Sequence, residues 1–95
     1  MTDTKNEIIR DVSELLGFEP PAISTGSTEP REFFVLINQA LGLGLNPRGG
    51  KQELARGIVE AAGMPWEPEF DSRGATVTLK GLQAVADAVY SLTAR

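Results

Sequence analysis

The chain has 95 residues and a formal net charge of −4, and it contains neither cysteine nor histidine. This length suits one domain, and the missing residue types exclude a disulfide framework and remove both the usual general base and the commonest zinc ligand. No apolar run approaches the roughly 18 residues that a membrane helix needs, and the polar first residues are unlike a secretory signal, so we expect a cytoplasmic, bacterial or phage protein without a membrane segment.

Apolar residues at helical spacing predict four helices. In chain order, we expect a helix over about 3–16, a linker over 17–28, helices over about 29–41 and 50–62, a short β-hairpin over about 66–78 and a helix over about 79–93. Gly17 and Gly63 are placed to end the first and third helices, and Thr78 is placed to cap the fourth. The expected fold is a single small domain that is mainly α, with the hairpin between the third and fourth helices.

Each expected helix has one apolar face that can enter a core. These faces comprise Ile8, Ile9, Val12, Leu15 and Leu16; Phe33, Phe34, Leu36, Ile37 and Leu41; Leu54, Ala55, Ile58, Val59 and Ala62; and Leu82, Val85, Ala86, Val89 and Leu92. Phe33 and Phe34 are adjacent, so we expect one of the two rings to remain at the surface.

The run Arg48-Gly49-Gly50-Lys51 stands directly before the third helical pattern. A helix N-terminus has unpaired N–H groups and a positive dipole end, so anions bind there readily. Glycine lets a ligand approach the backbone, and lysine adds a point charge. The alternative is an ordinary glycine-rich helix start in which Glu53 serves as a capping-box acid. The run is not a P-loop, because Gln52 follows the lysine where a hydroxyl is required.

The segment Leu36–Ala62, LINQALGLGLNPRGGKQELARGIVEAA, resembles a SAP-type DNA-binding module, in which a helix, an extended loop and a second helix carry a Gly-x-Lys-x-Glu-Leu signature. The matching residues are Leu41, Leu43, Gly49, Lys51, Glu53, Leu54 and Ile58. The resemblance covers about a third of the chain. It implies binding to double-stranded DNA, with phosphates meeting Arg48, Lys51 and the amides that open the third helix. One departure is that this helix ends in EAAG rather than in a basic turn.

The later run DSRGATVTLKGLQAVADAV is similar, with KQELARGIVEAAG before it, to accessory front domains of some bacterial restriction endonucleases. Those domains hold or read DNA while a separate domain cuts it. The likeness implies an attached or associated catalytic domain.

A winged-helix arrangement is a second interpretation of three helices followed by a hairpin. Arg73 would then reach the DNA from the hairpin turn, and Arg56 would lie on the outer face of the third helix. The distribution of charge allows either version, because residues 46–62 carry three basic and two acidic side chains whereas residues 1–20 carry two basic and five acidic ones. The DNA-binding residues predicted overall are Arg48, Gly49, Gly50, Lys51, Gln52, Arg56 and Arg73.

We expect no catalytic residue, no metal site and no cofactor. Glu67, Glu69 and Asp71 alternate along one run and would share a face of a strand, as metal ligands or as a solvated edge. The chain has no Glu-x-Lys sequence of the restriction-nuclease type. Trp66, the single tryptophan, could stack on a base or cover the core.

Two other functions remain open. An apolar face of the second helix, together with the leucines of 41–45, could dock a partner protein or form a homodimer. Alternatively, Glu7, Asp11 and Glu14 along the first helix could mimic DNA and block a DNA-binding protein.

Overall fold

The structure is a computed structural model that describes residues 4–20, 31–46, 48–72 and 76–94. These residues are mainly helical and form α1 (Thr4–Leu16), α2 (Arg31–Leu41), α3 (Lys51–Ala61) and α4 (Leu79–Thr93). The helix ends lie within about two residues of those expected from the apolar spacing. The expected start of the second helix at 29–30 and the expected hairpin turn at 73–75, which includes Arg73 and Gly74, lie outside the described residues.

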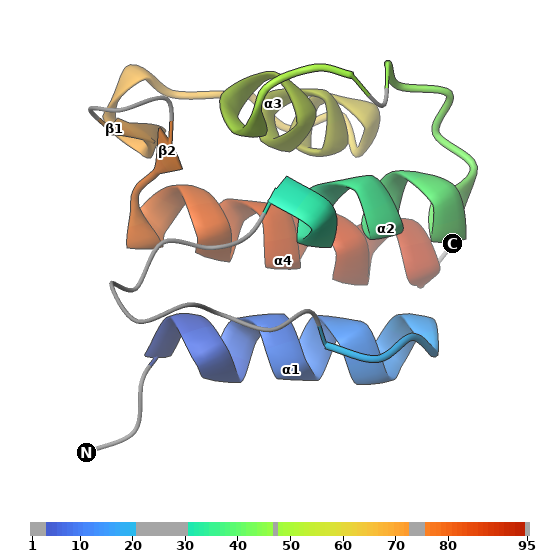
Figure 1. The fold of residues 1–95 in the computed structure, drawn as a ribbon. Coiled ribbons are helices and arrows are strands. Elements are labelled where there is room, and N and C mark those ends of the chain that lie inside the picture. Colours follow the sequence, from blue (N-terminus) through green and yellow to red (C-terminus); the bar gives the residue numbers. More distant parts are fainter. Residues whose placement is uncertain (1–3, 21–30, 47, 73–75, 95) are drawn as a thin grey trace.

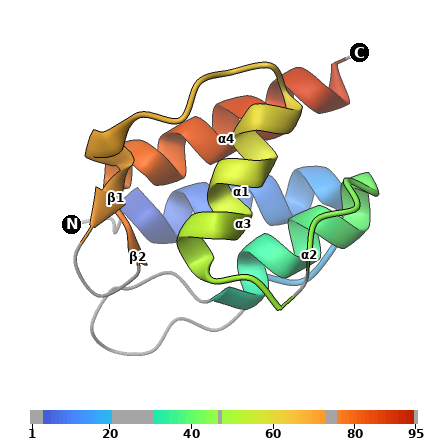
Figure 2. The ribbon, with the colours of Figure 1, turned by 90° about the horizontal axis from the view of Figure 1, so that it is seen from above.

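The helices are arranged in layers, with α3 and α1 on opposite sides of α2 and α4 (Figure 1). Seen from above, α1, α2 and α4 run in the same general direction, and α3 crosses them steeply (Figure 2). α4 packs against both α3 and α1, and α2 packs against α3. The core lies between these layers and includes buried side chains from all four helices and Val77.

The helix ends follow from local chemistry. Gly17 and Gly63 have positive φ angles of 81° and 77°, which glycine adopts without steric cost. The N–H groups of Gly17 and Phe18 both donate to the Ser13 carbonyl, which ends α1. Thr78 caps α4, because its hydroxyl accepts from the Gly81 N–H at 3.2 Å. These three residues take the roles that the sequence indicated.

Two expectations about the apolar faces are wrong. Phe33 and Phe34 are both fully buried, and their ring centroids lie 5.4 Å apart. Both can be buried because α2 contacts α3 and α1, so its buried face is wider than one neighbour would require. Leu15, expected in the core, is 46% exposed, since the face of α1 that packs inward is formed by Ile9, Val12 and Leu16 and Leu15 lies to one side of it.

In its described residues, the segment before α4 forms less strand than the hairpin expected over 66–78. Pro68–Phe70 is a 3-10 turn, and among the described residues antiparallel pairing joins β1 (Asp71–Ser72) with β2 (Thr76–Val77). Pro65 and Pro68 lack the N–H groups that a longer ladder would need. Glu67, Glu69 and Asp71 therefore do not lie along one face of a strand, and the geometry assumed for a metal site is absent. Among the described residues no cluster of acidic side chains could hold a metal ion.

Gly81 lies against the backbone of this segment, which yields a stability prediction. A Cβ at Gly81 would come within 2.9 Å of the Phe70 carbonyl oxygen, whereas a Cβ at Gly57 would meet the end of the flexible Leu45 side chain. We expect Gly81→Ala to destabilise the protein by about 1–3 kcal/mol, because a backbone carbonyl cannot easily move aside.

Gly57→Ala is the matched control, since the same change in helix α3 brings a propensity gain of about 0.5–1 kcal/mol that offsets the shift of Leu45. Urea denaturation followed by circular dichroism measures both. Equal stability of the two variants would contradict the close contact at Gly81.

Candidate nucleic-acid interface

Two side chains of α2 form hydrogen bonds with the loop between α2 and α3. The buried Asn38 side-chain amide donates to the Leu45 carbonyl and accepts from the Leu45 N–H, both at 3.0 Å. Arg31 donates from Nε to the Gly49 carbonyl at 2.8 Å. Arg31 and Asn38 are seven residues apart, which is about two helical turns, so they lie on the same face of α2. Hydrogen bonds to α2 therefore fix the loop near its beginning, at Leu45, and near its end, at Gly49.

Neither the Arg31 nor the Asn38 hydrogen bonds to the loop were predicted from the sequence. Asn38 interrupts the apolar face of α2, and a polar residue at such a position indicates a buried hydrogen-bonding role. That signal could have identified Asn38. Arg31 offered no comparable signal, because its partner lies 18 residues away in the chain.

The two hydrogen bonds between Asn38 and Leu45 yield a stability prediction. We expect Asn38→Ala to destabilise the protein by roughly 1–3 kcal/mol, because the Leu45 N–H and carbonyl groups lose their partner. Gln39→Ala is the control, since Gln39 is exposed on the same helix and should change stability by less than about 0.5 kcal/mol. Thermal unfolding followed by circular dichroism compares the two, and an Asn38→Ala protein as stable as the control would contradict this role.

A short turn leads from the loop into α3. The Asn46 side chain accepts from the Arg48 N–H, and its backbone carbonyl accepts from the Gly49 N–H, both at 3.0 Å. Gly50 is then extended, with φ −70° and ψ 171°, and is the N-cap of α3 without a side-chain hydrogen bond. The first amides of α3 have no acceptor within the helix, and the N-cap glycine has no side chain to offer them.

The two glycines before α3 have different roles. A Cβ at Gly49 would collide with the Glu53 carboxylate and come within 3.2 Å of the Asn46 carbonyl oxygen, whereas a Cβ at Gly50 would meet nothing within 4 Å. A side chain at Gly49 would thus displace the Glu53 carboxylate, whereas one at Gly50 has open space. The Glu53 carboxylate folds back toward the start of α3, where a capping acid would lie, so the protein already holds one negative charge near this helix end.

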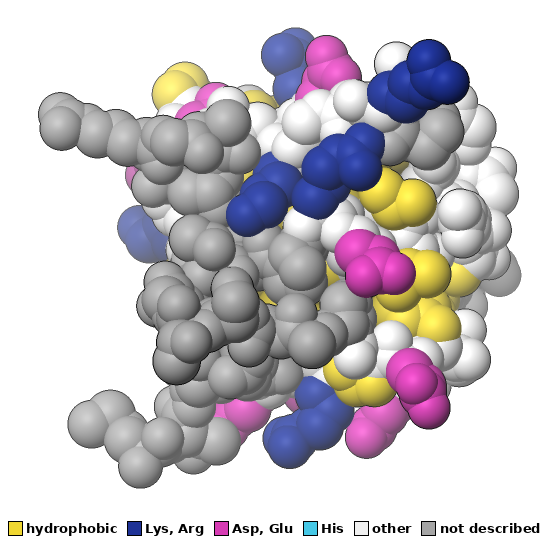
Figure 3. Space-filling view, in the orientation of Figure 1, with side chains coloured by type: hydrophobic (Ala, Val, Ile, Leu, Met, Phe, Trp, Pro, Cys, Tyr) yellow, Lys and Arg dark blue, Asp and Glu magenta, His cyan; other side chains and the backbone are white. Residues whose placement is uncertain are grey.

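Basic side chains surround the same helix start. Arg48 and Arg31 are exposed and Lys51 is half-buried, and the Arg31 bond to Gly49 brings the α2 cation to this run. Figure 3 shows Lys and Arg side chains gathered over the beginning of α3 and the adjoining start of α2. We call the three cations Arg31, Arg48 and Lys51 the basic cluster. One turn further along α3, Arg56 is exposed and contacts Glu60 at 3.4 Å.

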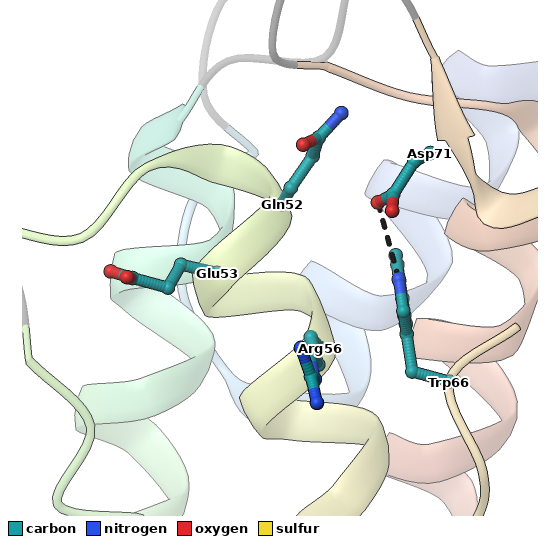
Figure 4. Close-up of a pocket in the computed structure, with 5 residues that line it drawn as sticks. All are labelled: Gln52, Glu53, Arg56, Trp66 and Asp71. Atoms are coloured by element: carbon teal, nitrogen blue, oxygen red, sulfur yellow. Dashed lines mark hydrogen bonds between the residues drawn. The ribbon is translucent and has the colours of Figure 1, made fainter. Parts of the chain in front are cut away.

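A hollow of about 220 Å³ lies beside this helix start and is lined by Gln52, Glu53, Arg56, Trp66 and Asp71. The half-buried Trp66 donates from Nε1 to the Asp71 carboxylate at 3.1 Å, and its ring lies edge-on to Phe70 with centroids 5.1 Å apart. In Figure 4 the indole is seen edge-on across the hollow from α3. The structure therefore brings the predicted residues Gln52 and Arg56 together with Trp66, a grouping that the sequence did not predict.

Comparisons of this chain with protein-family models, with curated proteins and with solved structures find no match. None of the helices that the structure describes has the length and apolar character needed to cross a membrane.

Proposed function

We propose that this protein binds double-stranded DNA without catalysing a reaction, and that phosphates contact the start of α3. The observation that carries the proposal is the Arg31–Gly49 hydrogen bond of 2.8 Å. It places Arg31 of α2 beside the run Arg48–Lys51, so basic residues from two elements of the chain lie near one helix N-terminus. Phosphate binding at such a place combines backbone N–H donors, the helix dipole and fixed positive charge.

The arrangement of the contacts favours the SAP-like version of this proposal. In that version α2, the loop that is hydrogen-bonded to it and α3 form a helix-loop-helix unit. Leu54 and Ile58 of α3 are buried and face the core of this unit. The winged-helix version relies on a long β-hairpin, whereas the observed pairing extends over two residues in each strand. In either version the protein would serve as an accessory module beside a catalytic domain.

Fluorescence anisotropy of a labelled duplex of about 20 base pairs, titrated with the protein at about 50 and 200 mM salt, tests the proposal. Neutralising three phosphates implies a loss of affinity of roughly 40-fold between these conditions. Affinity that does not depend on salt, or no binding at the lower salt, would contradict the proposal. A protein-docking module and an acidic DNA mimic both predict no binding to the duplex.

Removing the negative charge of Glu53 is predicted to raise the affinity for DNA rather than to lower it. We expect Glu53→Gln to raise duplex affinity by about fivefold, because a carboxylate a few ångströms from a phosphate costs on the order of 1 kcal/mol in water. The same titration measures it. Glu14→Gln, which removes one exposed negative charge on α1, is the control and should change affinity less. A lower affinity for Glu53→Gln would show that the phosphate lies elsewhere.

A further inference from the structure

The hollow between α3 and Trp66 has the size and walls of a site for one flat group. Its volume is about 220 Å³, below the roughly 300–1,000 Å³ of pockets for drug-sized ligands. One wall is the Trp66 indole, whose plane is held by the bond to Asp71 and by the contact with Phe70. A held aromatic plane beside an open space is what a stacked ring requires.

The polar groups around this space suit the edge of a neutral base better than a phosphate. The Asp71 carboxylate lies beside the Trp66 wall, where it would repel a phosphate, whereas the Glu53 carboxylate points away from this wall (Figure 4). A carboxylate such as that of Asp71 can accept hydrogen bonds from the exocyclic amino groups that cytosine and adenine carry.

The hollow also lies within reach of DNA held at the basic cluster. Gln52 and Glu53 line the hollow and directly follow Lys51 in the first turn of α3. A backbone phosphate at the helix start would therefore bring its own nucleotide to the opening of the hollow.

We propose that this hollow receives an unpaired, amino-bearing nucleobase, cytosine or adenine, which stacks on Trp66 while its phosphate stays at the basic cluster. The inference depends on the DNA binding proposed above. It assigns to Trp66 the stacking role rather than only the covering of the core. A base already unpaired is favoured, since no cost of opening a base pair has to be met.

The single tryptophan makes the test direct. Two duplexes are compared, one fully paired and one with a single unpaired cytosine, by anisotropy and by Trp66 fluorescence. We expect the unpaired cytosine to raise affinity roughly tenfold, as one stacked base does, and to quench the indole emission. Trp66→Ala should remove this preference and leave the affinity for the paired duplex and its salt dependence unchanged.

Asp71→Asn is the second variant, because it keeps the indole and replaces an acceptor. It should reduce the preference for unpaired cytosine over unpaired thymine, with circular dichroism confirming that both variants are folded. Equal affinity for the two duplexes without quenching, while salt-dependent binding persists, would overturn this inference alone. No binding to either duplex would overturn the proposed function as well. Quenching by a lysine-rich peptide but not by unpaired cytosine would assign the hollow to a basic peptide instead.

Discussion

Reversing the charge of Lys51 is expected to lower the affinity for a paired duplex by at least about tenfold, and Arg48→Glu together with Lys51→Glu to abolish measurable binding. Each reversal removes one cation and places an anion at the same point, so attraction to a phosphate becomes repulsion. The salt dependence should report the same loss, with the slope of log affinity against log salt falling by about one for each cation removed.

Arg10→Glu is the matched control for Lys51→Glu, because it changes the net charge by the same amount. Arg10 is exposed on α1, which lies across the α2 and α4 layer from α3 (Figure 1). We expect it to change affinity by less than about twofold, since exposed charges farther apart than a Debye length of about 8–10 Å are largely screened. Equal losses for the two variants would show that the overall charge, rather than the start of α3, governs binding.

Truncating Phe34 is expected to have the largest effect on stability. The ring is fully buried and packs beside that of Phe33, so Phe34→Ala should cost about 3–5 kcal/mol through lost transfer free energy and the cavity that remains. Small domains have a free energy of unfolding of about 5–15 kcal/mol, so this change removes a large fraction of it. Urea denaturation followed by circular dichroism measures the shift.

Leu15→Ala is the control for this change, because Leu15 is large and apolar but 46% exposed. It should change stability far less than Phe34→Ala, by about 1 kcal/mol or less. A small effect of Phe34→Ala would mean that the ring can leave the core. The second helix would then regain the apolar surface that docking of a partner protein requires.

Helix positions were predictable because they depend on neighbours in the chain. Leu54, Ile58 and Val59 recur at helical spacing, and all are buried on one face of α3. The caps are also local, since Thr78 bonds an amide three residues away and Gly63 adopts a positive φ that glycine tolerates. The run Arg48–Lys51 could likewise be recognised from sequence as a helix start with positive charge.

Contacts between distant segments could not be predicted in the same way. The width of the buried face of α2, and so the burial of both Phe33 and Phe34, depends on how many helices pack around it. The length of a β-ladder depends on which backbone groups find partners, and in the described part of this segment, which contains Pro65 and Pro68, two residue pairs join the strands.

The sequence by itself determined the four helices, the caps at Gly17, Gly63 and Thr78 and the glycine-rich, basic start of α3, because these features depend on residues within one or two turns of each other. Tertiary structure alone decided that Arg31 joins Gly49 and that Trp66 lies across a hollow from Gln52 and Arg56. Both groupings arise from the packing of separate elements, and the spacing of residues along one element carries no information about which distant side chain it will meet.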